Sequence, residues 1–198
     1  MLAYLGSKVF HAMTHAIPRF SFADLPAEIA SALRAKFERL GYLGEFFAAT
    51  AHQPAALKSF IDFTEFSKGE LDMRLVELIA LTVATMKAVA YEKNQHERLA
   101  LKLGYGRDWV VDVELLTPHT ATLLDESERC VQRVVLAAAS RDGVASEPFL
   151  NEVVARLGVA KAVAVLFVLG RYISHAVMVN SLGIGAPVSS IFDPEFSA

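Results

Sequence analysis

The segment between Leu71 and Gly106 constrains most strongly how this chain of 198 residues can fold. Apolar residues recur in it at intervals of three and four, which is the period of an α-helix packed against a core. Three polar side chains, Glu77, Glu92 and His96, interrupt this apolar surface. The segment therefore predicts core helices that carry two carboxylates and an imidazole into the interior.

The rest of the chain also has helical patterns, and strand patterns are nearly absent. Ala, Leu, Glu, Lys and Arg dominate, while Pro, Gly and Asp mark the ends of the periodic segments. We expect helices at residues 26–40, 43–51, 54–67, 72–88, 90–104, 107–114, 120–141, 146–157 and 159–182. Residues 1–22 and 184–198 are expected to be irregular arms. A chain of this length then forms one all-α domain over residues 1–198.

Charge and cysteine content exclude several classes of protein. The net charge is −3 and no basic run is present, which argues against a nucleic-acid surface. The single cysteine, Cys130, excludes an intramolecular disulfide and any CxxC redox or zinc motif. A reducing cytoplasmic location is the default for such a chain.

Hydropathy bears on membranes and on self-association. The longest uninterrupted apolar run, Ala162–Gly170, has about nine residues, whereas about 20 are needed to span a bilayer. Residues 1–16 lack the charged start and apolar stretch of a signal peptide. We therefore expect no membrane partner. The mean hydropathy of +0.36 favours subunits that bury apolar surface against each other as a homo-oligomer.

Glu92 and His96 are four residues apart and therefore lie on one helix face. A carboxylate at this spacing can orient the imidazole and raise its pKa, which is the minimum equipment for general acid–base catalysis. The pair can equally be a solvated surface contact, so spacing alone leaves both interpretations open.

Glu77 lies among apolar residues, and a carboxylate buried there must be paired or neutral. It precedes the second carboxylate by about 15 positions, or roughly 22 Å along an unbroken helix. Glu77 can face His96 only if the chain turns back between Lys87 and Ala90, where no Gly or Pro demands a break. A structural ion pair with Arg74 or Lys87 is the alternative.

These residues resemble a motif of the carboxymuconolactone decarboxylase and alkylhydroperoxidase (AhpD-like) superfamily. The family's L-x-x-R-x-x-E element corresponds to residues 71–77, and its aromatic, histidine and closing glycine correspond to Tyr91, His96 and Gly104. The resemblance covers residues from about 20 to 185 and is most specific between 74 and 104. It implies an AhpD-like helical bundle that assembles as homo-oligomers.

The two cysteine positions of the peroxidase branch hold Val89 and Glu92 in this chain. Cys130 lies outside the motif and has no resolving thiol, so we expect no thiol peroxidase activity. The decarboxylase branch, which also lacks the cysteine pair, places a carboxylate four residues before the histidine. Glu92 and His96 satisfy that pattern.

The resemblance therefore implies a lyase that performs proton chemistry, without a cofactor, on a small carboxylated, lactone-like substrate. In this hypothesis His96 moves a proton to or from carbon, Glu92 holds the imidazole and Glu77 sets its protonation. Substrate-binding candidates are Arg74, Tyr91 and Arg171. A non-catalytic oligomeric or ligand-binding protein of the same fold is one alternative, and an antioxidant protein by family label only is another.

Two further patterns could suggest a functional site, but the sequence favours a simpler interpretation of each. A di-iron bundle needs Glu-x-x-His pairs on two helices, whereas Glu92 and His96 are one position too far apart and no second copy occurs. We therefore predict no metal and no cofactor. His175 lies on a mostly apolar helix, which is typical of a hydrogen-bonded core histidine.

Overall fold

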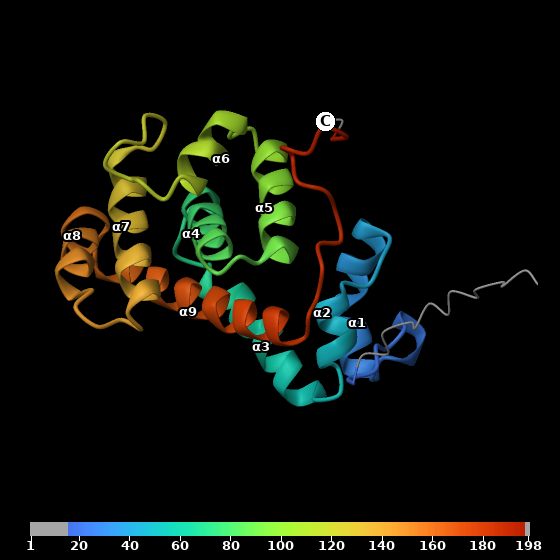
Figure 1. The fold of residues 1–198 in the computed structure, drawn as a ribbon. Coiled ribbons are helices and arrows are strands. Elements are labelled where there is room, and N and C mark those ends of the chain that lie inside the picture. Colours follow the sequence, from blue (N-terminus) through green and yellow to red (C-terminus); the bar gives the residue numbers. More distant parts are fainter. Residues whose placement is uncertain (1–15, 197–198) are drawn as a thin grey trace, which may run out of the picture.

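The computed structural model describes residues 16–196, and residues 1–15 and 197–198 of the predicted arms lie outside this range. The described residues form nine α-helices and one short 3₁₀ helix, with no strand, which confirms the predicted all-α fold (Figure 1). The elements are η1 (Phe22–Asp24), α1 (Ala27–Leu40), α2 (Glu45–Thr50), α3 (Pro54–Ser67), α4 (Met73–Met86), α5 (Ala90–Lys102), α6 (Arg107–Glu114), α7 (Glu126–Ser140), α8 (Glu147–Leu157) and α9 (Val159–Ser181).

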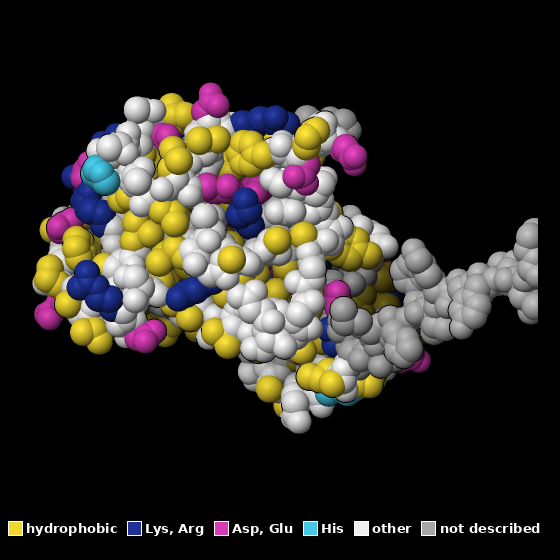
Figure 2. Space-filling view, viewed as in Figure 1, with side chains coloured by type: hydrophobic (Ala, Val, Ile, Leu, Met, Phe, Trp, Pro, Cys, Tyr) yellow, Lys and Arg dark blue, Asp and Glu magenta, His cyan; other side chains and the backbone are white. Residues whose placement is uncertain are grey.

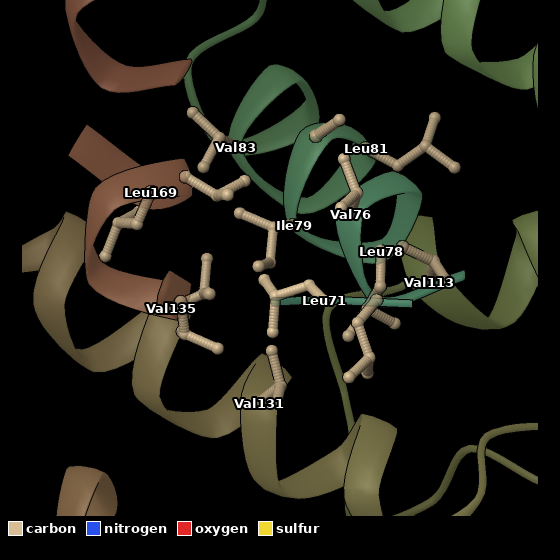
Figure 3. Packing of buried hydrophobic residues seen from close by; sticks show 14 of the residues in the cluster. Leu71, Val76, Leu78, Ile79, Leu81, Val83, Val113, Val131, Val135 and Leu169 are labelled. Atoms are coloured by element: carbon tan, nitrogen blue, oxygen red, sulfur yellow. The ribbon is translucent and has the colours of Figure 1, made fainter. Parts of the chain in front are cut away.

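Helix α4 is the centre of the main hydrophobic core. Every residue from 75 to 84 is buried, because α5, α6, α7 and α9 surround the helix. Figure 3 shows Ile79 of α4 near Val131 and Val135 of α7, with Leu169 of α9 beside them. A helix covered on all sides must be apolar around its whole circumference, which explains why Glu77 is so conspicuous in the sequence.

A second hydrophobic cluster lies under α1, α2 and α3 and includes Ile29, Phe46 and Leu57. The C-terminal half of α9 contributes Ala176 and Val179 to this cluster, whereas its N-terminal half belongs to the main core. The two clusters therefore meet along α9, and the polar residues described below lie at their junction.

The chain turns back between α4 and α5 at Ala88, which adopts a left-handed conformation with φ of 53°. The backbone N–H of Val89 donates to the Ala84 carbonyl at 2.9 Å, and the Ala88 N–H donates to that of Thr85 at 3.2 Å. This is the Schellman pattern that usually requires glycine. The break between Lys87 and Ala90 on which the sequence interpretation depended is therefore present, although no glycine marks it.

The predicted helix over residues 120–141 begins later than expected, at Glu126. Asp112 accepts hydrogen bonds from the backbone N–H groups of Thr122 and Leu123, both at 2.7 Å, and this holds residues 120–125 in a loop. Asp125 then caps α7 in a reciprocal capping box with Glu128. The other predicted helices agree with the structure to within two residues at each end.

Residues 184–196 contain turns but no helix, and they run along α5 (Figure 1). Asn94 donates to the Val188 carbonyl at 2.8 Å, and Glu97 accepts from the Ile191 N–H at 2.8 Å. Arg98 donates to the Ser189 carbonyl at 2.9 Å. One side of α5 is thus held by the C-terminal segment.

Helix α9 is the one described helix that is long and apolar enough to cross a membrane by length and composition. The uninterrupted run at residues 162–170 understated this length, because the helix continues through polar residues to Ser181. Within its most apolar stretch, 56% of the residues are buried inside the protein. Its contacts with α3, α4, α7 and α8 explain its composition as that of a core helix.

Candidate functional site

A cavity of about 910 Å³ lies where the two hydrophobic clusters meet, and α1, α3, α4, α5 and α9 contribute to its walls. Its polar lining includes Lys36, Glu77, Tyr91, Glu92, His96, Arg171, Tyr172 and His175. Volumes of this order are typical of small-molecule sites. The structure therefore places the sequence-predicted residues Glu77, Glu92, His96, Tyr91 and Arg171 around one space.

His96 lies between the two carboxylates. Its Nδ1 is 2.6 Å from Oε2 of Glu77 on α4, and its Nε2 is 3.1 Å from Oε2 of Glu92, one turn earlier on α5. The hydroxyl of Tyr172 on α9 lies 3.3 Å from the same Nε2. Glu77 is only 1% exposed. The turn at Ala88 makes this arrangement possible, because it folds α5 back against α4.

The two carboxylates govern the charge of His96. Burial by itself lowers the pKa of an imidazole, but Glu77 and Glu92 outweigh this effect and raise the pKa of His96 to about 9. At neutral pH the ring is therefore an imidazolium, and each ring N–H can donate to one carboxylate. Such a protonated imidazole can act as a general acid, which donates a proton, and not as a general base.

Glu92 is held from α9 as well as by His96. Its Oε2 is 3.4 Å from an Arg171 guanidinium nitrogen, and its Oε1 is 2.9 Å from Nδ1 of His175. The second contact is close enough for an ion pair but is not directed as a hydrogen bond. Burial alone would raise the pKa of Glu92, but His175, Arg171 and His96 together keep this pKa well below its usual range.

His175 is itself buried, at 2% exposure, and this burial lowers its pKa even though Glu92 acts in the opposite direction. The lowered pKa of His175 opposes the lowered pKa of Glu92, because a neutral His175 stabilises the Glu92 carboxylate less than a charged one does. We favour an ionised Glu92 beside a neutral His175, since the permanently charged Arg171 and the imidazolium of His96 are sufficient to hold the carboxylate.

The two cavity tyrosines are neutral phenols. Burial raises the pKa of both Tyr91 and Tyr172 above the usual tyrosine range. Tyr91 is tightly seated, because a Cβ added at Gly44 would lie 2.7 Å from its hydroxyl oxygen. Glycine at position 44 therefore allows the close approach of the two segments.

Arg74 does not join the site, which corrects its prediction as a substrate-binding residue. Its Nε donates to Oε1 of Glu128 at 2.7 Å, and its guanidinium lies over the rings of Tyr105 and Trp109. The alternative pairing of Arg74 with Glu77 is also wrong. Arg74 lies at the start of α4, three residues from Glu77, and faces α6 and α7 instead of the cavity. The ammonium group of Lys87, the other proposed partner of Glu77, donates to the Ala139 carbonyl at 2.9 Å.

The two positions that hold cysteine in the peroxidase branch have different surroundings. Val89 is buried in the second hydrophobic cluster, whereas Glu92 faces the cavity. Cys130 on α7 is buried, and its Sγ lies 3.7 Å from a carboxylate oxygen of Glu152. Burial raises the pKa of the Cys130 thiol, which disfavours the reactive thiolate.

Sequence reasoning missed Tyr172 and Lys36 and placed His175 only in the core. Arg171, Tyr172 and His175 occupy one stretch of an otherwise apolar helix, and that concentration of polar groups was the available signal. No comparable signal marks Lys36 on the polar α1. Within residues 16–196, no three His, Cys, Asp or Glu side chains are arranged to hold a metal ion.

Comparison with known proteins places this geometry in a fold. No protein-family model matches the chain, and a search of curated proteins finds no sequence match. Among solved structures, the AhpD core of a peroxidase-related protein from Ralstonia eutropha JMP134 is similar, with a TM-score of 0.73 at 16% identity over 87% of this chain and 94% of the other.

Two other solved structures are also similar. A protein of unknown function from Agrobacterium tumefaciens, with a suggested role as the antioxidant defence protein AhpD, has a TM-score of 0.64 at 16% identity over 70% of this chain and 94% of its own. A cysteine-to-alanine variant of the debrominase Bmp8, in complex with 2,3,4-tribromopyrrole, has a TM-score of 0.74 at 14% identity, covering 86% and 91% of the two chains.

These likenesses confirm the fold expected from the motif between Arg74 and Gly104, although the identities are too low to carry an activity across. With one cysteine in 198 residues, the chain also cannot form the CxxC pair of the peroxidase branch. The protein is thus an all-α protein of the AhpD-like fold that has no CxxC pair.

Proposed function

We propose that this protein is an acid–base enzyme of the carboxymuconolactone decarboxylase type that acts on a small carboxylated, lactone-like substrate. The observation that carries the proposal is the position of His96 between two carboxylates at the wall of a cavity. A surface ion pair needs no cavity and no buried second carboxylate, so the geometry favours a chemical role.

The proton step follows from the charge of His96. When a carboxylated substrate loses CO₂, the electron pair of the broken C–C bond remains on the substrate as an enolate. The Nε2–H of His96 is the proton donor that completes the reaction, and the ring then recovers a proton from water. Glu77 holds the opposite nitrogen and keeps the ring oriented, as an orienting carboxylate does in other acid–base sites.

The test is a panel of small carboxylated lactones incubated with the protein in D₂O and followed by NMR. We expect loss of CO₂ and incorporation of one deuterium at the former carboxyl-bearing carbon. His96→Gln should reduce the rate by roughly 10²-fold or more, within the range for loss of a general acid. Ligand binding without turnover would instead support the non-catalytic alternative.

A parallel assay with hydroperoxide and a thiol reductant addresses the antioxidant alternative. We expect no turnover above the uncatalysed rate, because Val89 and Glu92 replace the required thiols and Cys130 is buried. Robust peroxide reduction that survives a Cys130→Ser substitution would overturn the proposal that proton chemistry is the main activity.

We also propose that copies of the chain associate through the exposed face of α9. Figure 2 shows hydrophobic side chains spread over the face on which α9 lies. The exposed large apolar residues of this helix are Val159, Val163, Leu166, Phe167 and Val177. Gly170 lies near the middle of α9, and a Cβ there would meet nothing within 4 Å in this chain.

A helix-interior glycine costs about 1 kcal/mol relative to alanine. No contact within the chain requires a glycine at position 170. Close approach of a second α9 would require a small residue there and so explains the glycine. The sequence expectation of a homo-oligomer therefore has a specific candidate surface.

A further inference from the structure

The cations that line the cavity differ in whether they already have partners. Arg171 is occupied by Thr64 and Glu92, and its guanidinium lies 4.3 Å from the centre of the Tyr172 ring. Lys68 is paired with Glu65 at 3.3 Å. These cations have internal partners and leave little capacity for a ligand.

Lys36 and Arg39 of α1 are different. Both line the cavity, and they lie three residues apart, so they share one face of the helix. Like Lys102 of α5, which also lines the cavity, neither is part of an ion pair among residues 16–196. The Lys36 ammonium lies 4.6 Å from the centre of the Phe47 ring, which also lines the cavity.

The surroundings of Lys36 are electrostatically unfavourable for its charge. Protein atoms crowd the cavity wall, and this desolvation, together with Arg171, Lys68 and Arg39, lowers the pKa of Lys36 to about 8 despite the attraction of Glu92. The Lys36 side chain is nevertheless exposed to solvent, so a ligand can reach its ammonium group. A ligand anion placed beside Lys36 would relieve this repulsion.

We propose that Lys36, assisted by Arg39, binds an anionic group of the ligand, either a carboxylate or a phosphate. This assigns the role expected of Arg74 and Arg171 to residues that the sequence pattern did not single out. The inference rests on the proposed function only in that the remainder of the ligand then extends towards His96. Anion binding itself requires no turnover.

The experiment measures binding of three probes of similar size by isothermal titration calorimetry. Benzoate and phenyl phosphate carry the two candidate anions, and benzamide is the neutral control. Wild type is compared with Lys36→Met and with Arg34→Met. Arg34 is an exposed cation on the same helix that does not line the cavity, so its variant controls for a general loss of charge.

We expect wild type to bind one or both anions more tightly than benzamide. Lys36→Met should weaken anion binding roughly tenfold, as loss of one charged hydrogen bond does. Arg34→Met should have no effect, and His96→Gln should still bind the anion even if all turnover is lost. The preferred anion distinguishes a carboxylate ligand from a phosphate ligand.

A second measurement does not depend on a substituted protein. Reductive methylation of the wild type, followed by mass spectrometry, should show that the preferred anion protects Lys36 and leaves Lys58 of α3, which pairs with Asp62, unprotected. Equal protection by benzamide would overturn the proposal. Equal anion affinity of wild type and Lys36→Met, or no anion binding by wild type at millimolar concentration, would overturn it as well.

Discussion

The Nδ1 atom of His96 lies 2.6 Å from Oε2 of Glu77, and this contact joins the polar helix α5 to the buried centre of α4. The contact fixes which ring nitrogen points to the interior and leaves Nε2 towards Glu92 and Tyr172. A carboxylate that is 1% exposed is costly to bury unless it stays paired.

Replacing Glu77 by Gln should lower the pKa of His96 from about 9 towards or below its ordinary value. The amide keeps a hydrogen-bonding oxygen but removes the charge that favours the imidazolium. NMR titration of the histidine ring protons measures this change directly. Glu114→Gln is the matched control, because Glu114 is a partly buried carboxylate that pairs with Lys93 outside the cavity. An unshifted His96 in Glu77→Gln would contradict the assigned charge state.

Stability should fall with rising pH because of His96. Its pKa is raised from 6.5 to about 9 on folding, so the folded protein holds the proton more tightly than the unfolded chain does. This contribution is fully present below about pH 6.5 and is lost as the pH rises through 9, amounting to roughly 3 kcal/mol. Urea unfolding of wild type and His96→Gln at several pH values measures it. Parallel pH profiles for the two proteins would rule out this linkage.

Ala88→Gly should stabilise the protein by about 1 kcal/mol, because Ala88 occupies a left-handed conformation that carries a steric cost for any residue with a Cβ. For a protein of this size the melting temperature should rise by about 2–4 °C. The same substitution at Ala84, which is inside α4, should instead destabilise. A loss of stability in Ala88→Gly would mean that the turn depends on the alanine side chain.

Arg74→Met should lower stability by about 1–3 kcal/mol, because Glu128 loses a charged donor while the Trp109 indole and the Asp125 N–H remain. Binding of the anionic probes should be unchanged, since Arg74 does not line the cavity. Chemical unfolding and calorimetry test the two halves of this prediction. A weaker affinity for benzoate without a change in stability would return Arg74 to the ligand site.

Phe167→Glu should reduce the molar mass measured by light scattering if α9 forms the contact between copies. The side chain is 52% exposed, so the substitution has little cost within one chain but places a charge in an apolar interface. Val144→Glu alters an even more exposed apolar residue, at 69% exposure, and should leave the molar mass unchanged. A monomeric wild type at all concentrations would refute association through this face.

The helical fold follows closely from local patterns in the sequence. Periodicity predicts each of the nine α-helices found in residues 16–196. The D-x-x-E spacing of Asp125 and Glu128 is the local signal for the observed start of α7. The turn at Ala88 was harder to predict, because its geometry is one for which glycine is the usual signal. The turn is stabilised by the burial of Val89 in the second cluster, whose other residues are distant in the sequence.

The sequence predicts only the part of the site that depends on local spacing. Glu92 and His96 share a helix face, so their spacing alone predicts their contact. Arg171, Tyr172 and His175 reach the same carboxylate and imidazole from a helix about 80 positions later, and no local rule connects them. Arg74 was misassigned because its guanidinium pairs with Glu128 and lies over Trp109, and no local rule connects these residues of α6 and α7 with the start of α4.

The C-terminal segment along α5 forms part of the cavity wall, because Val188 lines the cavity together with Arg98, which donates to the Ser189 carbonyl. Residues 188–191 hydrogen-bond to Asn94, Glu97 and Arg98 of that helix. His96 of the same helix lines the cavity. Lys36 and Arg39 of α1 line the same cavity, so α1 contributes cavity residues that are not part of the proton-transfer group. Substitutions in α1 should therefore alter which compounds the cavity accepts while the residues that transfer the proton stay the same.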